Sequence, residues 1–178
     1  MNSNKKINSL LKLAFKTTEK KMKGSGIDYN SSGTCCISVF IKGSNCFTAN
    51  LGDSRAVLYR KQPTRNSFQN VAIELSWDHK PTRPDEKDRI KSKGGKIERL
   101  LNAKKEPVGP YRVWEDEEGP GIAITRTLGD FAAKRVGLIS EPEIQYLELT
   151  EQDQFIIVAS DGVWEVMSSG EAVGFIIH

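Results

Sequence analysis

Short apolar and alternating runs, bounded by glycine, proline and asparagine, dominate the chain and predict β-strands more often than helices. Extended segments are expected at residues 34–42, 45–60, 71–75, 111–114, 137–140, 144–149 and 155–159, with another beginning at Ile97. The first two are joined around Gly43 and Ser44, and the polar stretch 63–70 is expected to be a hairpin loop. Gly52 interrupts the second segment, which indicates a bulge or the close approach of another backbone.

Helical spacing is confined to a few places. Residues 1–23 carry apolar side chains near the i, i+3, i+4, i+7 spacing, between lysines that are most simply a solvated face, with membrane binding as a minor alternative. Pro84 begins a short surface helix that ends at Gly94, with an Asp85–Arg89 pair expected along it. A last helix is expected at residues 170–178, capped by Ser168 or Ser169. Residues 121–135 fit either a strand or a helix, and 115–118 are expected to be a solvated loop.

The count of elements predicts the fold class. Seven to nine short strands, mostly joined as hairpins, with only two or three helices argue against a parallel β-α-β fold. The chain of 178 residues, 38% of them hydrophobic, is long enough for one domain with a substantial core. We therefore expect an α+β domain in which two mostly antiparallel sheets pack together with helices outside.

Two acids stand at glycine-marked breaks in apolar runs. Residues 155–159 predict a strand buried on both faces, and Asp161 follows directly in the sequence Ser160-Asp161-Gly162. Asp53 occupies a similar position after the run 45–51. If the two strands are neighbours, both carboxylates could hold Mg²⁺ or Mn²⁺, which prefer oxygen ligands. The spacing leaves open the simpler interpretation that the two acids form separate turns, Asp161 by capping the next helix.

Composition excludes several classes of function. The net charge is +3 with dispersed lysines, which predicts no nucleic-acid partner, and no apolar run is long enough for a membrane span. The N-terminus lacks a secretory signal, so a cytoplasmic location is expected, with the nucleus not excluded. Cys35, Cys36 and Cys46 are an odd number with only two histidines in the chain, which argues against disulfides and against a zinc site.

Six colinear motifs together resemble the metal-dependent, type 2C protein phosphatases. They are Ser32-Gly33-Thr34, residues 49–58 (ANLGDSRAVL), residues 78–95 (DHKP followed by Glu86, Arg89, Ile90 and Gly94-Gly95), residues 122–130 (IAITRTLGD), residues 139–143 (ISEPE) and residues 159–166 (ASDGVWEV). The resemblance implies a four-layer α-β-β-α sandwich, and hydrolysis of phosphoserine and phosphothreonine in phosphoprotein substrates by water activated on Mg²⁺ or Mn²⁺.

The resemblance also assigns metal ligands. Asp161 matches an acid that binds the first metal of a binuclear pair and a third ion. Asp53 matches an acid that helps to hold that third ion. Glu165 stands where the family often has aspartate near the same cluster, so its ligand role is a weaker expectation. The remaining ligands, the phosphate-binding arginine and the histidine general acid belong to family motifs that are not found in residues 1–178, so no catalytic residue is assigned in this chain.

Those missing motifs lead to the expectation that residues 1–178 are a single partial catalytic domain, incomplete at both termini and inactive alone. The alternative is a non-catalytic interaction or regulatory module. Exposed strand edges in a partial domain could support a strand-exchange dimer.

Other polar residues have simpler interpretations. His79 is expected to be structural, and a nucleophile at Ser160 lacks an adjacent base. Arg55, Arg112 and Arg126 could attract phosphate or could equally pair with nearby acids. The tryptophans Trp77, Trp114 and Trp164 are expected at or near the core.

Overall fold

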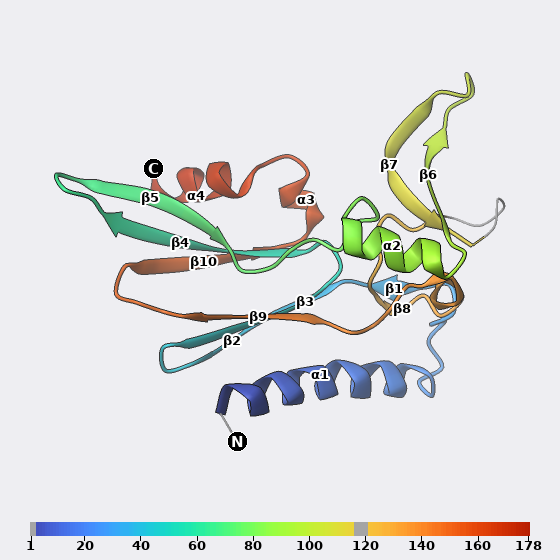
Figure 1. Ribbon diagram of the computed structural model, residues 1–178, viewed down its shortest axis with the longest axis horizontal. Helices are drawn as coiled ribbons and strands as arrows, with labels where there is room; N and C mark the ends of the chain where they lie inside the picture. Colours follow the sequence, from blue (N-terminus) through green and yellow to red (C-terminus); the bar gives the residue numbers. More distant parts are fainter. Residues whose placement is uncertain (1–2, 116–120) are drawn as a thin grey trace. The chain divides into compact units, whose positions relative to one another are not determined.

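A computed structural model describes residues 3–115 and 121–178, which form two compact units (Figure 1). Unit 1 contains the described residues of Met1–Cys35 and His79–Pro142, and unit 2 contains Cys36–Asp78 and Glu143–His178. Each unit is therefore assembled from two separate stretches of the chain. No helix among the described residues is both long and apolar enough to cross a membrane.

Unit 2 is built from two three-stranded antiparallel sheets. One has the order β2 (Cys36–Lys42), β3 (Asn45–Leu51) and β9 (Glu143–Glu148), and the other has the order β10 (Asp153–Ala159), β4 (Arg55–Pro63) and β5 (Phe68–Glu74). Both sheets contribute apolar side chains to a shared cluster that includes Cys46, Ala56 and Leu58. The two sheets thus form a sandwich with a common core.

Residues 45–60, expected as one interrupted strand, are two strands that belong to different sheets. The break at residues 52–54 is the turn by which the chain passes from β3 to β4, so the expected bulge is wrong. The expected pairing of residues 71–75 with the preceding strand is confirmed, and the hairpin loop is shorter than 63–70 because β4 continues to Pro63 and β5 begins at Phe68.

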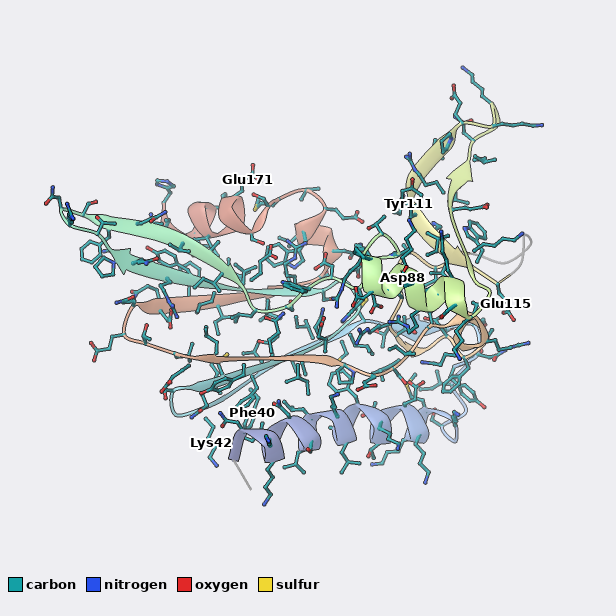
Figure 2. All side chains as sticks on the ribbon, in the orientation of Figure 1. Phe40, Lys42, Asp88, Tyr111, Glu115 and Glu171 are labelled. Carbon is teal, nitrogen blue, oxygen red and sulfur yellow. The ribbon has the colours of Figure 1, made fainter. Side chains whose placement is uncertain are left out.

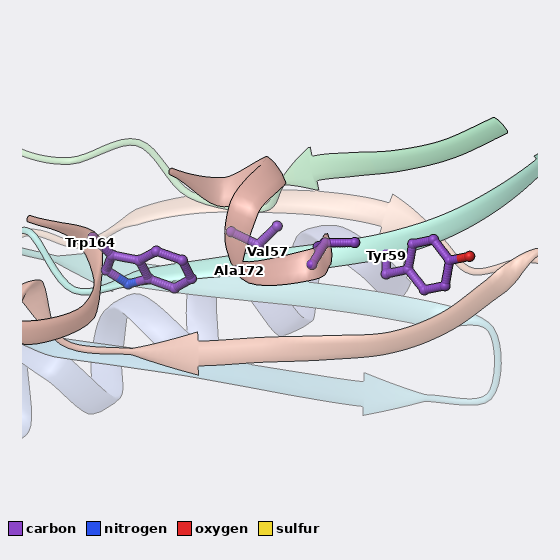
Figure 3. Close-up of a cluster of buried hydrophobic side chains, with 5 residues drawn as sticks. Val57, Tyr59, Trp164 and Ala172 are labelled. Atoms are coloured by element: carbon purple, nitrogen blue, oxygen red, sulfur yellow. The ribbon is translucent and has the colours of Figure 1, made fainter. Parts of the chain in front are cut away.

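Helices cover the outer face of the β10-β4-β5 sheet. The short α3 (Asp161–Trp164) and α4 (Ser169–Ile177) bring Trp164, Ala172 and Val173 against Val57 and Tyr59 of β4 (Figure 3). The expected N-cap of the last helix is confirmed: the hydroxyl of Ser168 accepts from the Glu171 N–H, and the Glu171 carboxylate accepts from the Ser168 N–H.

Strand β10 is not buried on both faces, contrary to the expectation for residues 155–159. It lies at the end of its sheet and pairs only with β4 among the described strands. Val158 is 48% exposed, whereas Phe155 and Ile157 pack partly buried against the α4 side. Both faces of β10 are only partly covered, Ile156 by the cluster between the sheets and Phe155 and Ile157 by the cluster under the helices. A continuous apolar run did not distinguish such an edge strand from a buried central strand, because both carry β-branched residues throughout.

Unit 1 contains α1 (Ser3–Met22), α2 (Pro84–Ser92), the two-residue strands β1 (Gly33–Thr34) and β8 (Leu128–Gly129), the hairpin β6 (Lys96–Leu101) and β7 (Pro107–Trp114), and the 3-10 helix η1 (Ala133–Val136). Ile90 of α2, Val113 of β7 and Val136 and Leu138 near η1 form its main apolar cluster. Both predicted helices are confirmed. The expected Asp85–Arg89 pair is wrong, because Arg83 binds Asp85 and Glu86 binds Arg89.

The ambiguous stretch 121–135 forms neither a long strand nor an α-helix. It contains an isolated bridge at Ile122, the short strand β8 and the start of η1. Of the loop expected at residues 115–118, only Glu115 is described, and residues 116–118 lie outside the described part of the chain.

The expected class, α+β with antiparallel sheets and helices, is confirmed. Unit 2 alone supplies three layers of the expected sandwich: two sheets, and the helices that cover one of them. The fourth layer and the single-domain organisation stay predictions.

Candidate metal site

Asp53 and Asp161 lie at the same end of one strand pair. Strand β4 begins at Arg55 and β10 ends at Ala159, and these two residues are paired across the antiparallel ladder. Asp53 precedes Arg55 by two residues, and Asp161 follows Ala159 by two. The register therefore brings the two predicted ligands to one end of the sheet, the condition that spacing alone could not establish.

A tight turn holds Asp53. Gly52 has a φ of 107°, in the left-handed region that glycine adopts without strain. The Asn50 side-chain amide, itself buried, donates to the Gly52 carbonyl at 3.2 Å and to the Trp77 carbonyl at 3.0 Å. Asp53 is only 6% exposed within this turn. Its carboxylate is therefore positioned by a rigid local structure.

Asp161 opens α3 and is exposed to solvent. The N-cap is Ser160, and no side chain caps this helix, so the interpretation of Asp161 as a capping residue is wrong. Trp164 holds the short helix against the strand, because its indole N–H donates to the Ala159 carbonyl at 2.8 Å. The carboxylate of Asp161 thus stands on a fixed helix but is accessible to water.

Glu165 follows α3 as its C-cap residue and is also exposed. Its N–H donates to the Asp161 carbonyl at 2.8 Å, which places it one helical turn after that residue. Within residues 3–115 and 121–178, no three acidic, histidine or cysteine side chains gather closely enough to hold a metal ion. The ligand role of Glu165 stays a prediction.

The donor set fits a hard divalent cation in part. Two carboxylates at one end of a sheet, one fixed in a turn and one facing solvent, are ligands of the type that Mg²⁺ and Mn²⁺ take. With only these two, most of a coordination shell would be left to water.

The arginine Arg55, which begins β4, pairs with acids. It makes a bidentate ion pair with Asp78, at 3.0 and 2.9 Å, and also donates to Ser169 at 3.1 Å. The hydrogen bonds to Asp78 raise the pKa of Arg55 despite its burial. Its position over the Trp164 ring, 5.4 Å from the centroid, further fixes the guanidinium. Arg55 is a structural link at this end of unit 2.

Two other arginines considered as phosphate ligands are also engaged. Arg126 binds the buried carboxylate of Glu86 at 2.7 Å, and Arg112 donates to the Gly121 carbonyl at 2.7 Å. Glu86 belongs to one of the sequence motifs, but it was not predicted to be fully buried and to bind two arginines, as it does in the structure. Its i, i+3 spacing from Arg89 was the available signal.

The predictions for the histidine, the tryptophans and the cysteines have different outcomes. His79 is fully buried, and its carbonyl accepts from the Thr125 N–H at 2.9 Å, as expected for a structural residue. Trp164 is a core residue, but Trp77 is 58% exposed, so its assignment to the core is wrong. The three cysteines are not joined in disulfides.

The chain matches the family model described as Protein phosphatase 2C over residues 1–178. It is 42% identical over 165 residues to "Probable protein phosphatase 2C 64" of Oryza sativa subsp. japonica, covering 92% of this chain and 37% of that protein. It is 40% identical to "Probable protein phosphatase 2C 52" of Arabidopsis thaliana, covering 92% of this chain and 34% of that protein. The chain thus spans little more than a third of the length of these two relatives.

Solved structures agree with this assignment. A serine-threonine phosphatase 2C from Toxoplasma gondii superposes with a TM-score of 0.77 at 25% identity, covering 94% of this chain and 54% of that one. A sex-determining protein from C. elegans, at 19% identity and a TM-score of 0.71, shares the fold over 93% of this chain and 36% of that one. With a family model that matches every residue from 1 to 178, the chain belongs to the protein phosphatase 2C family.

Proposed function

We propose that this chain is part of a metal-dependent protein phosphatase that hydrolyses phosphoserine and phosphothreonine in protein substrates. The observation that carries the proposal is the family match over residues 1–178, combined with the register that brings Asp53 and Asp161 to one end of the β4–β10 pair. Mg²⁺ or Mn²⁺ is the proposed cofactor, with Asp161 and Asp53 as ligands and Glu165 as a weaker candidate.

When bound, such an ion lowers the pKa of a water molecule and neutralises phosphate charge. The residues described here supply carboxylate oxygens and hold them in place. Asp53 is fixed by its turn, and Asp161 is fixed by the short helix that Trp164 anchors to β10. None of the described residues is assigned the role of general acid, so this chain by itself is expected to show little or no turnover.

The proposal is tested with the longest polypeptide that the gene encodes around these residues. We expect Mn²⁺-dependent release of phosphate from a phosphothreonine peptide. Asp161→Asn should lose at least about a hundredfold in kcat/KM, since asparagine would hold the cation that neutralises the reacting phosphate less tightly than aspartate does. The control is Asp88→Asn, which removes an exposed carboxylate from α2 in unit 1 (Figure 2).

A folded, full-length polypeptide without metal-dependent hydrolysis would contradict the proposal. It would favour the alternative of a non-catalytic interaction module that keeps the family's fold. The flanking coding sequence offers an independent check. The proposed phosphatase function predicts an Asp-Gly-His-Gly motif before residue 1 and an Asp-Asn motif after residue 178.

We further propose that the 178-residue chain forms a dimer through strand β10. This strand lies at the end of its sheet in the described part of the chain, and its Val158 is 48% exposed. Antiparallel pairing with β10 of a second copy would satisfy its outer backbone groups. Light scattering should give twice the monomer mass at micromolar concentration, and Val158→Lys should shift the sample to monomer. A strictly monomeric chain at high concentration contradicts this pairing.

A further inference from the structure

Unit 1 contains a groove to which neither the metal site nor the proposed phosphatase function assigns a role, although residues 139–142 of its lining belong to the motif at residues 139–143. It has a volume of about 600 Å³ and runs between α1 and the segment that follows η1. Its lining includes Lys12, Leu13 and Lys16 from the helix and Leu138, Ile139 and Pro142 from the segment. The volume lies in the range of sites that take small organic ligands, about 300–1,000 Å³.

The apolar part of the lining is available to a ligand. Leu13 is 56% exposed although it lines the groove together with the buried Leu138. An exposed leucine on its own is ordinary, but here it faces a concave surface with Ile139 and Pro142. A ligand with an apolar body would remove the exposed Leu13 and the half-buried Ile139 from water, which is favourable by about 25 cal/mol per Å² of apolar surface.

The charges around the groove are mostly neutralised. Lys134 binds Glu19 at 2.8 Å in a largely buried pair, and Lys12 binds Glu141 at 2.6 Å with both side chains more than half exposed. Lys16 differs, because within the described residues it makes neither a hydrogen bond nor an ion pair. The groove therefore offers one cation that is ready to bind an anion.

We propose that this groove is a binding site for a small amphipathic anion, with an alkyl body on the apolar lining and a carboxylate on Lys16. The exposed pair of Lys12 and Glu141 can open at little cost, since such surface pairs contribute about 0–1 kcal/mol, and it can add a second contact to the anion. The concave shape fits a small molecule better than a flat membrane surface, which would meet the lysines spread along α1 without entering the groove.

Decanoate is a suitable probe for this site. Decanol keeps its alkyl body without the carboxylate, and acetate keeps the carboxylate without the alkyl body. We expect isothermal titration calorimetry on the 178-residue chain to show saturable binding of decanoate, with acetate undetectable. Lys16→Met keeps the aliphatic length but removes the charge, and should weaken decanoate binding about three- to tenfold while leaving decanol unchanged. The matched control is Lys20→Met, an exposed lysine of the same helix outside the groove, which should change decanoate affinity less than about twofold.

A second variant tests the apolar lining. Leu13→Asp introduces a negative charge at an exposed position of α1, where folding should be maintained, and should abolish binding of decanoate and weaken that of decanol. Three results would overturn the proposal: no decanoate binding below its micelle concentration, equal losses in Lys16→Met and Lys20→Met, or undiminished binding in Leu13→Asp. If phosphatidylserine vesicles bind the chain and both lysine variants weaken that binding equally, α1 is a membrane-binding surface and the groove is not the site.

Discussion

Ala159 at the end of β10 pairs with Arg55 at the start of β4. The pairing is antiparallel, so the chain leaves β10 at the same end of the sheet where it enters β4. Asp161 and Asp53 each stand two residues beyond this pair. Two acids that are more than a hundred residues apart in the sequence are in this way brought to the same end of one strand pair by a single backbone register.

This relationship predicts weak Mn²⁺ binding at the end of the β4–β10 pair. In an NMR titration of the chain, paramagnetic Mn²⁺ should broaden the amide signals of residues 52–54 and 160–162 before others. Binding should be in the millimolar range, because two carboxylates leave most of the coordination shell to water. Asp161→Asn should weaken it roughly tenfold, the equivalent of about 1.4 kcal/mol.

Glu151→Gln serves as the control in this titration and should leave the broadening unchanged, since Glu151 is an exposed carboxylate that precedes β10, at the opposite end of that strand from Asp161. Two outcomes would show that Asp53 and Asp161 do not share a metal. One is broadening near only one of the two acids, and the other is broadening that survives in Asp161→Asn.

The buried carboxylate of Glu86 predicts a stability effect in unit 1. Arg89 binds its two oxygens at 2.6 Å each, Arg126 binds Oε1 at 2.7 Å, and Thr125 donates a short hydrogen bond. Glu86→Gln keeps the shape but leaves two guanidinium groups without their anion, which should lower the free energy of unfolding by about 3 kcal/mol. Urea denaturation measures the change. Glu98→Gln on the exposed side of β6 is the matched control and should shift the midpoint only slightly; equal effects of the two variants would contradict the linking role of Glu86.

Local patterns predicted much of the fold. The amphipathic spacing of residues 1–23, the Pro84 start of α2 and the Ser168 cap of α4 all depend on side chains within one or two turns, and all three helices are where the sequence placed them. Hairpin partners were also predictable, because β2 with β3 and β4 with β5 are joined by short turns.

Long-range relationships could not be obtained in this way. Nothing local shows that the chain changes sheets at Gly52, or that β10 returns to the edge of β4. The metal-site prediction required family resemblance for the same reason, since the β4–β10 register is a property of the fold. The groove beside Lys16 could not be predicted from the sequence, because its two sides are about 120 residues apart.

Asp153 predicts a pH-dependent contribution to the stability of unit 2. Burial acts to raise its pKa, but the bidentate ion pair with Arg60, at 2.6 and 3.0 Å, and hydrogen bonds from Thr150 outweigh burial and hold the pKa below its ordinary value. A depressed native pKa means that the stabilisation is complete above the unfolded pKa of about 3.9 and is lost as pH falls through the native value.

Asp153→Asn should therefore lower the free energy of unfolding by about 1–3 kcal/mol at pH 7, and the difference from the wild type should shrink as the pH falls below about 4. Urea midpoints at pH 7, 5 and 3.5 measure it. Glu151→Gln, two residues away and exposed, is the control. A difference that stays constant over this range, or grows toward low pH, would mean that the Arg60 pair does not set the pKa of Asp153.

Gly129 and Gly26 of unit 1 are glycines for different physical reasons, backbone strain alone at Gly26 and strain together with a steric clash at Gly129. Both have left-handed backbones, with φ of 83° and 75°. A Cβ at Gly26 would meet no atom within 4 Å, whereas one at Gly129 would lie 2.3 Å from the Ser32 carbonyl oxygen, which also accepts from the Asp130 N–H. Gly26→Ala should therefore cost about 1 kcal/mol for backbone strain alone.

Gly129→Ala carries the same strain together with a clash against backbone that cannot rotate away, so it should cost about 3 kcal/mol or more. Because Gly129 pairs with Gly33 in the β1–β8 ladder, the clash should also break the hydrogen bond from Asp130 to Ser32. Hydrogen exchange at the Asp130 amide should then accelerate in Gly129→Ala but not in Gly26→Ala. Equal unfolding free energies in the two variants would show that the β1–β8 contact can separate at no cost, and that its close backbone approach does not stabilise unit 1.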